Sequence, residues 1–224
     1  MTSRVTPVQV KGWDLPVRLV HGLLLARVGF SWWSGEQGGD WMGWHSRSGY
    51  AILTLVMFRF GWGFIGSDSA RFASFVRGPR ASFAYLRSVF KRQPKAYLGH
   101  NPLGGWMIMA LLLVLLVQAV TGLLGNDDSD YEAPLAHWLS HDASSLATTL
   151  HGYGFDLLLI LLGLHVAAVL THVVLQRDDM LKAMFTGVKT SLTGENAGRM
   201  ASNWRALSVV AVVVLGVYAL IRFG

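Results

Sequence analysis

Three histidines occupy one apolar stretch of the sequence, "HGYGFDLLLILLGLHVAAVLTH", which runs from His151 to His172. His165 lies 14 residues after His151 and 7 residues before His172. An α-helix turns by about 100° per residue, so these spacings return to within about 40° and about 20° of the starting direction. The three imidazoles are therefore predicted to form one stripe along a single helix. His151 and His165 would lie about 21 Å apart along its axis.

This stretch is one of several that are long enough to cross a membrane. Of the 224 residues, 52% are hydrophobic and only 14% are charged, which is too apolar a composition for an ordinary soluble domain. We predict an all-α integral membrane protein, a bundle of four transmembrane helices with a fifth transmembrane helix at the C-terminus. The first run lacks an A-x-A-like cleavage site and is expected to remain as a mature helix. The predicted spans are 15–33, 45–65, 104–124 and 150–175 within a domain of residues 1–190, and 206–222 within a C-terminal segment of residues 191–224.

The connecting segments alternate in charge. Segments 34–44 and 125–149 contain no lysine or arginine, whereas 66–102 and 176–206 are rich in both. The positive-inside rule then places the N-terminus and both basic segments in the cytoplasm and the C-terminus in the periplasm. The basic residues are Arg71, Arg77, Arg80, Arg87, Lys91, Arg92, Lys95, Arg177, Lys182, Lys189, Arg199 and Arg205, and the acidic ones are Glu36, Asp40, Asp127, Asp128, Asp130, Glu132 and Asp142.

Because successive spans cross the membrane in opposite directions, the depth of a residue can be inferred from its position in its span. His45 and His151 fall at the outer ends of their spans, while His21 and His165 fall near the inner level. Ionisable residues inside a membrane are costly and usually mark a functional site. Each histidine alone is equally consistent with a hydrogen bond to a neighbouring helix. Four histidines matched in depth, two at each level, favour a pair of ligand sites.

Two histidines at one level suit a flat macrocycle that brings its own four nitrogens, whereas a bare zinc ion needs three or four protein ligands. Bis-histidine cages between helices are typical of b-type haem. The sequence has no cysteine, which excludes c-type haem attachment and thiolate iron–sulfur clusters. The residues therefore favour b-type haem as the cofactor, and a haem-free proton or ion relay through the same histidines is the alternative.

Small and cationic residues near the histidines fit such a cofactor. Gly49 and Gly152 remove side-chain bulk beside His45 and His151, although close helix packing explains glycine equally well. Arg59 at the inner level and Arg47 at the outer level are candidates to bind haem propionates.

Arg27 and Asp156 lie at similar depths in the first and fourth spans. An unpaired charge inside a membrane is expensive, so we predict that Arg27 either pairs with Asp156 or reaches a propionate.

The basic segment 66–102 also contains aromatic and apolar residues, which favours interfacial helices on anionic lipid headgroups over a nucleic-acid surface. Pro79 in "RGPR" is predicted to divide it into two short helices. Membrane lipid is thus an expected partner, and nucleic acid is not. The apolar residues are Phe72, Phe75, Phe83, Tyr85, Leu86 and Phe90.

Together these motifs resemble the bacterial cytochrome b561 family and its relatives, the b-type cytochrome subunits of nickel–iron hydrogenases and formate dehydrogenases. The resemblance covers about residues 13–190 and departs from the family at the fifth helix. It rests on "DLPVRLVHG" (14–22), "HSRSGYAILTLVMFRFGWGFIGS" (45–67), "GHNPLGGWM" (99–107), "QAVTGLL" (118–124) and the paired histidines of the fourth span.

The resemblance implies two haem b groups, one held by His21 and His165 and the other by His45 and His151. It further implies electron transfer in the bacterial inner membrane between the quinone pool and a periplasmic redox partner, either a cytochrome c or a dehydrogenase- or hydrogenase-type enzyme.

A quinone site needs a hydrogen-bonding, protonatable group near a haem edge at the membrane surface. On the cytoplasmic side the candidates are His172 and His100. The alternatives are that His172 is a substitute haem ligand and that His100 caps the third span. His137 and His141 are expected to face water in the outer loop. Rival functions are a stand-alone superoxide:quinone oxidoreductase and a passive membrane anchor; acidic outer loops suit a basic protein better than an anion.

Overall fold

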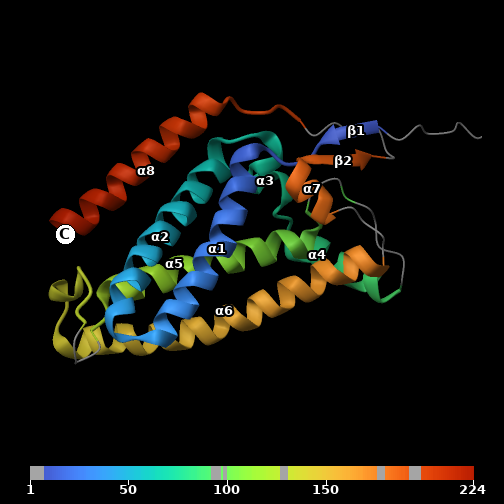
Figure 1. Ribbon diagram of the computed structural model, residues 1–224. Coiled ribbons are helices and arrows are strands. Elements are labelled where there is room, and N and C mark those ends of the chain that lie inside the picture. The colour runs from blue at the N-terminus through green and yellow to red at the C-terminus, as the bar shows by residue number, and fades with distance from the viewer. Residues whose placement is uncertain (1–7, 92–96, 98–99, 127–130, 176–179, 192–197) are drawn as a thin grey trace, which may run out of the picture. The chain divides into compact units, whose positions relative to one another are not determined.

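Helices occupy all five predicted spans in the computed structural model, which describes residues 8–91, 97, 100–126, 131–175, 180–191 and 198–224 (Figure 1). Of the charged residues used for orientation, Arg92, Lys95, Asp127, Asp128, Asp130 and Arg177 lie outside the described residues. The long helices are α1 (Leu15–Gln37), α2 (Met42–Ile65), α5 (Pro102–Leu124), α6 (His141–Leu175) and α8 (Asn203–Phe223).

Four segments among the described helices are long and apolar enough to cross a membrane: Gly39–Ile65, Pro102–Leu124, His141–Val174 and Asn203–Phe223. The helix α1 has sufficient length but is not among the four. It carries Arg18, Arg27 and Glu36, and these charges lower its mean hydropathy. A membrane span at 15–33 therefore stays a prediction.

The helix α6 begins at His141 rather than at residue 150, where the apolar pattern starts. Ser140 precedes it and accepts hydrogen bonds from its first turn, at its side-chain oxygen from Ala143 N–H (3.4 Å) and at its carbonyl from Ser144 N–H (2.9 Å). The first turns of α6 are rich in serine and threonine and show no helical repeat of apolar residues. The hydropathy pattern therefore did not predict this extension. The expectation that His141 lies in a loop was wrong.

The segment between α2 and α5 forms two short helices, as Pro79 predicted: α3 (Phe72–Phe75) and α4 (Pro79–Phe90). Proline is well suited to the first position of a helix because its missing N–H would have no intrahelical partner there. Another short helix, α7 (Met180–Thr186), follows α6, and single turns of 3₁₀ helix lie at Gly39–Trp41, Asp68–Ala70 and Ala136–Trp138.

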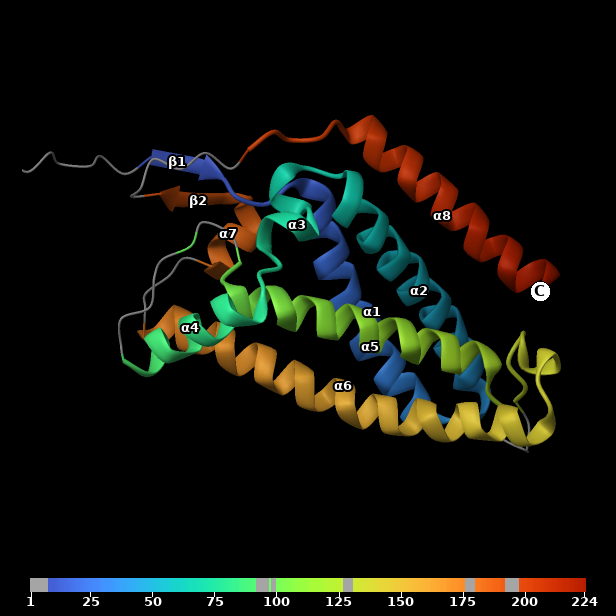
Figure 2. The ribbon, with the colours of Figure 1, turned by 180° about the vertical axis from the view of Figure 1, so that it is seen from behind.

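A two-stranded antiparallel sheet adds to the helices, so the all-α prediction was incomplete. Strand β1 (Val8–Lys11) pairs with β2 (Val188–Ser191), with Lys11 opposite Val188 (Figure 2). Four-residue strands so far apart in sequence give no local hairpin signal.

The chain divides into two compact units. The first comprises Met1–Leu19, Gly61–Met109 and Gly163–Ala206, and the second Val20–Phe60, Ala110–Leu162 and Leu207–Gly224. In the first, Trp62 is fully buried and donates its indole N–H to the Asp14 carboxylate (2.7 Å). In the second, a core of Leu53, Ala119, Leu123, Leu135 and Val217 joins α8 to α2 and α5.

Candidate cofactor site

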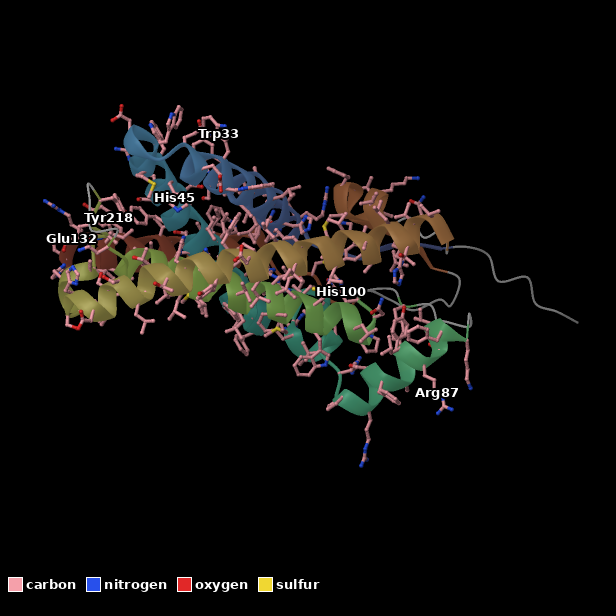
Figure 3. The ribbon with its side chains drawn as sticks, turned by 90° about the horizontal axis from the view of Figure 1, so that it is seen from below. Trp33, His45, Arg87, His100, Glu132 and Tyr218 are labelled. Atoms are coloured by element: carbon pink, nitrogen blue, oxygen red, sulfur yellow. The ribbon has the colours of Figure 1, made fainter. Side chains whose placement is uncertain are left out.

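His45 of α2 and His151 of α6 face each other in the second unit. Their ring centroids are 6.0 Å apart and their planes are inclined by 75°. Figure 3 shows His45 projecting from α2 toward α6. Imidazole nitrogens bind metal ions at about 2 Å, so two rings on opposite sides of one ion have centroids roughly 6 Å apart. The observed spacing suits a single metal between the two rings.

Both rings are held by the same kind of hydrogen bond. Nδ1–H of His45 donates to the carbonyl of Ser31 on α1, and Nδ1–H of His151 donates to the carbonyl of Gln118 on α5, each at 2.9 Å. A carbonyl only accepts, so in a neutral ring the proton is on Nδ1 and the lone pair is on Nε2. Metal-binding histidines are typically oriented by such bonds, which leave the other nitrogen for the metal.

Gln118 binds His151 at two points. Its carbonyl accepts from the ring, and its side-chain amide donates to the carbonyl of His151 (2.8 Å). Thr121 Oγ1 also lies 3.2 Å from His151 Nδ1. Gln118 and Thr121 lie in the motif "QAVTGLL", but neither side-chain type by itself indicates a site residue. Ser31 was missed because its contribution is a backbone carbonyl, which every residue type carries.

A mainly apolar pocket surrounds the two rings, with walls from α1, α2, α5 and α6 that include Ile52, Leu115 and Phe155. Gly49 and Gly152 also line it, and a Cβ on either would meet nothing within 4 Å. These predicted glycines therefore face open space, as residues beside a flat cofactor would.

Two observations test whether a macrocycle suits this pocket. Among the described residues, no group of three or more histidine or acidic side chains could hold a bare ion, so this pair suits a metal that brings further ligands. The buried Oγ of Ser31 and Oε1 of Gln118 also have no hydrogen-bond partner within the described part of the chain. Orphaned polar atoms beside a cavity are available to a bound group or to ordered water. The residues present fit a haem.

Two other glycines lie directly against the imidazole rings of His151 and His45. A Cβ on Gly122 would lie 3.0 Å from Cε1 of His151, and a Cβ on Gly35 would lie 3.0 Å from Nδ1 of His45. A side chain at either position would press on the ring and shift it by a few tenths of an ångström, so glycine at both positions leaves room for the imidazoles where they lie.

Gly122→Val is expected to weaken cofactor binding at this site because the added methyl groups displace the His151 ring from the Gln118 carbonyl. Loss of such an orienting contact typically lowers metal affinity by about 10–100-fold. Haem titration of the purified apoprotein would measure the change. Gly29→Val is the matched control, because a Cβ on Gly29 meets nothing within 4 Å and Gly29 does not line the pocket. Equal affinities in the two variants would contradict the argument.

The other predicted residues lie apart from this pocket. Arg59 is buried in α2 and does not line it. Arg47 is exposed and places its guanidinium 4.8 Å from the centre of the Trp44 ring, a cation–π contact. Arg27 and Asp156 are both exposed, and no ion pair joins them in the part of the chain that the structure describes. That predicted pair is not formed.

The second predicted histidine pair is divided between the units. His21 lies on α1 in the second unit, and His165 lies on α6 in the first unit. His21 is exposed and His165 is half-buried. Their pairing around one cofactor stays a prediction.

His172 is the centre of a polar cluster in the first unit. Its Nδ1–H donates to the carbonyl of Ala168 (2.9 Å), so its Nε2 is an acceptor. The hydroxyl of Tyr85 and the side-chain amide of Asn101 both lie 3.2 Å from this nitrogen and can donate to it. Tyr85 comes from α4 and Asn101 from the start of α5.

The orientation of Asn101 follows from its position before α5. Its Oδ1 accepts from Gly104 N–H (2.8 Å), which makes it the helix cap and directs its NH₂ group toward His172. An asparagine before a proline is a signal for a helix start, and it could have identified this residue.

His100 lies in a different environment from His172. The indole N–H of Trp13 donates to its Nε2 (3.4 Å), and its ring centroid is 5.1 Å from that of Phe75 (His100 is labelled in Figure 3). Asn101, not His100, caps α5, so the expectation of a capping histidine was wrong.

Comparison with known proteins gives one family and two relatives. Residues 12–187 match the family model described as prokaryotic cytochrome b561. The relatives are named as probable Ni/Fe-hydrogenase B-type cytochrome subunits. That of Rhizobium leguminosarum bv. viciae is 27% identical over 157 residues, and that of Bradyrhizobium diazoefficiens is 24% identical over 157 residues. Each alignment covers 64% of this chain and 66% or 64% of the relative, so the chain spans just under two thirds of their length. No solved structure matches.

Proposed function

The chain belongs to the prokaryotic cytochrome b561 family, and from that membership we propose that it carries electrons across a bacterial inner membrane with two haem b groups. His45 and His151 would hold one haem, and His21 and His165 the other. The observation that carries the proposal is the facing pair His45 and His151, in which both Nδ1 atoms donate to backbone carbonyls.

Bound haem would supply a one-electron redox centre whose potential depends on its axial ligands and surroundings. The protein orients the two imidazole ligands and shields the haem from water. Ser31 and Gln118 orient the two imidazoles and raise the electron density on each Nε2. The apolar walls of the pocket exclude water, which lowers the local dielectric constant around any charge on the metal.

We further propose that the redox partner binds at the end of the second unit that carries His45, which the charge pattern assigns to the periplasm. Glu36, Asp40, Glu132 and Asp142 are exposed there (Glu132 is labelled in Figure 3), and such acidic surfaces attract a basic protein surface. The relatives are named as hydrogenase cytochrome subunits, which favours a hydrogenase-type enzyme over a cytochrome c.

The cluster around His172 is our proposed quinone site. Reduction of a quinone to a quinol consumes two electrons and two protons. The hydroxyl of Tyr85 and the amide of Asn101 are donors that could bind a quinone carbonyl, and His172 could exchange a proton at Nε2. His100 is the weaker candidate, because its Nε2 accepts from the indole of Trp13 between two aromatic rings.

Two measurements on the purified full chain would test the electron-transfer function. The first is a reduced-minus-oxidised spectrum with a haem-to-protein ratio, for which we expect a low-spin b-type spectrum and two haems. The second uses vesicles that contain the protein and entrapped ferricyanide. A reductant that cannot cross the membrane should bleach the ferricyanide far faster than in protein-free vesicles. Absence of haem would favour a proton relay or a passive anchor instead.

A further inference from the structure

The helix α4 has one buried face and one exposed face in the first unit. Ser82 and Tyr85 are buried, and Tyr85 contacts His172. Phe72 and Phe75 of α3 are also buried. The sequence assigned Phe72, Phe75 and Tyr85 to the membrane surface together with the other apolar residues of this segment, and the structure removes these three from that set.

The residues that remain exposed combine apolar and basic side chains. Phe83 is 69% exposed and Phe90 is 81% exposed, and Leu86 lies between them on the helix surface. Arg80 and Arg87 lie beside this apolar stripe, and Figure 3 shows Arg87 directed away from α4 into open space. We call these five residues the α4 patch: Arg80, Phe83, Leu86, Arg87 and Phe90.

Part of the α4 patch is hollowed. Arg80, Phe83 and Arg87 line a shallow groove with Pro79 and Ala84. The two arginines are seven residues apart, about two helical turns, so both long side chains can reach over the groove from its ends. Within the described residues, neither guanidinium has a carboxylate partner. The groove is therefore lined by two guanidinium groups that are available to an anion and by the aromatic ring of Phe83.

A hydrogen bond from a tryptophan joins the segment just before α4 to the N-terminal end of α5, which is long and apolar enough to cross a membrane. The indole N–H of Trp106, in the second turn of α5, donates to the carbonyl of Arg77 (2.8 Å). Trp106 is 47% exposed. Partly exposed tryptophans at the ends of transmembrane helices typically lie at the level of the lipid headgroups. The α4 patch begins three residues after Arg77, so it belongs near this level.

We propose that the α4 patch binds an anionic phospholipid, with the lipid phosphate held by Arg80 and Arg87 in the groove. Guanidinium groups bind phosphate oxygens through paired, charge-assisted hydrogen bonds. Phe83, Leu86 and Phe90 contact the upper part of the acyl chains, as the apolar face of an interfacial helix does. The proposal is independent of haem binding and of quinone reduction.

Native mass spectrometry of the full chain in detergent, titrated with phosphatidylglycerol or phosphatidylcholine, would test the site. A basic residue near an anionic membrane surface contributes enough attraction for roughly a 5-fold change in affinity. We therefore expect Arg80→Gln/Arg87→Gln to bind phosphatidylglycerol roughly 30-fold more weakly. Phosphatidylcholine carries the same phosphate, but its trimethylammonium group cancels the negative charge, so it should bind the wild type more weakly and lose less affinity in the variant. Inorganic phosphate alone should not displace the bound lipid. The far-ultraviolet circular dichroism of the variant should match that of the wild type.

Arg77→Gln is the matched control. It removes one positive charge from the same segment, as each of the two substitutions in the double variant does, but Arg77 donates to the carbonyl of Ser74 and does not line the groove. Its affinity for phosphatidylglycerol should change much less than that of the double variant. Phe83→Ser should weaken binding of both lipids because it removes an apolar side chain that lines the groove. Equal binding of the two lipids by the wild type, or equal losses in Arg77→Gln and the double variant, would overturn the proposal.

Discussion

Replacing His45 by alanine is expected to lower the haem content of the purified protein from two per chain to one. The change removes one of the two imidazoles that face each other across 6.0 Å, and His151 alone cannot complete the bis-histidine site. The haem-to-protein ratio and the amplitude of the reduced-minus-oxidised spectrum would measure the loss. His137→Ala is the control because His137 is exposed and lies outside the pocket, so that variant should keep both haems.

Double variants test which histidines share a haem. If His45 and His151 bind the same haem, then His45→Ala/His151→Ala should lose no more haem than either single variant. By contrast, His45→Ala/His21→Ala should lose both, because it removes one ligand from each proposed pair. The reverse pattern would contradict the assignment of pairs, while retention of two haems in His45→Ala would contradict ligation by His45.

His172→Ala is expected to abolish most quinone reduction while leaving both haems in place. It removes the group that accepts hydrogen bonds from Tyr85 and Asn101 and that would exchange a proton with the quinone. General acid–base catalysis by one side chain commonly contributes at least about 100-fold to a rate. We expect a fall of that order in the rate at which a quinone analogue oxidises the prereduced haems, measured by anaerobic stopped-flow spectroscopy.

Two further variants sharpen this test. Tyr85→Phe keeps the ring but removes the hydroxyl, so it should give an intermediate rate. His100→Ala removes a histidine that contacts Trp13 and Phe75 instead of the His172 cluster, and its rate should stay close to that of the wild type. Loss of a haem in His172→Ala would identify His172 as a ligand and would contradict its assignment to the quinone site.

Local patterns in the sequence predicted the long helices and the residues whose side chains can take part in chemistry. Hydropathy and length located all five long helices, and Pro79 located the division between α3 and α4. The 14- and 7-residue spacings placed three histidines on what is one continuous helix, α6. These features can be predicted because each depends on residues close together along the chain. The helical repeat, the bilayer thickness and the fixed backbone angle of proline then determine the local structure.

The contacts that hold these residues in place depend on the tertiary fold. The carbonyls of Ser31 and Gln118 select the nitrogen that each imidazole presents, yet every residue has a carbonyl, so no residue type marks this role. Asn101 and Tyr85 meet His172 from separate elements, and β1 meets β2 from opposite parts of the chain. Contacts between distant segments depend on packing in three dimensions, which a periodic pattern of hydropathy does not specify.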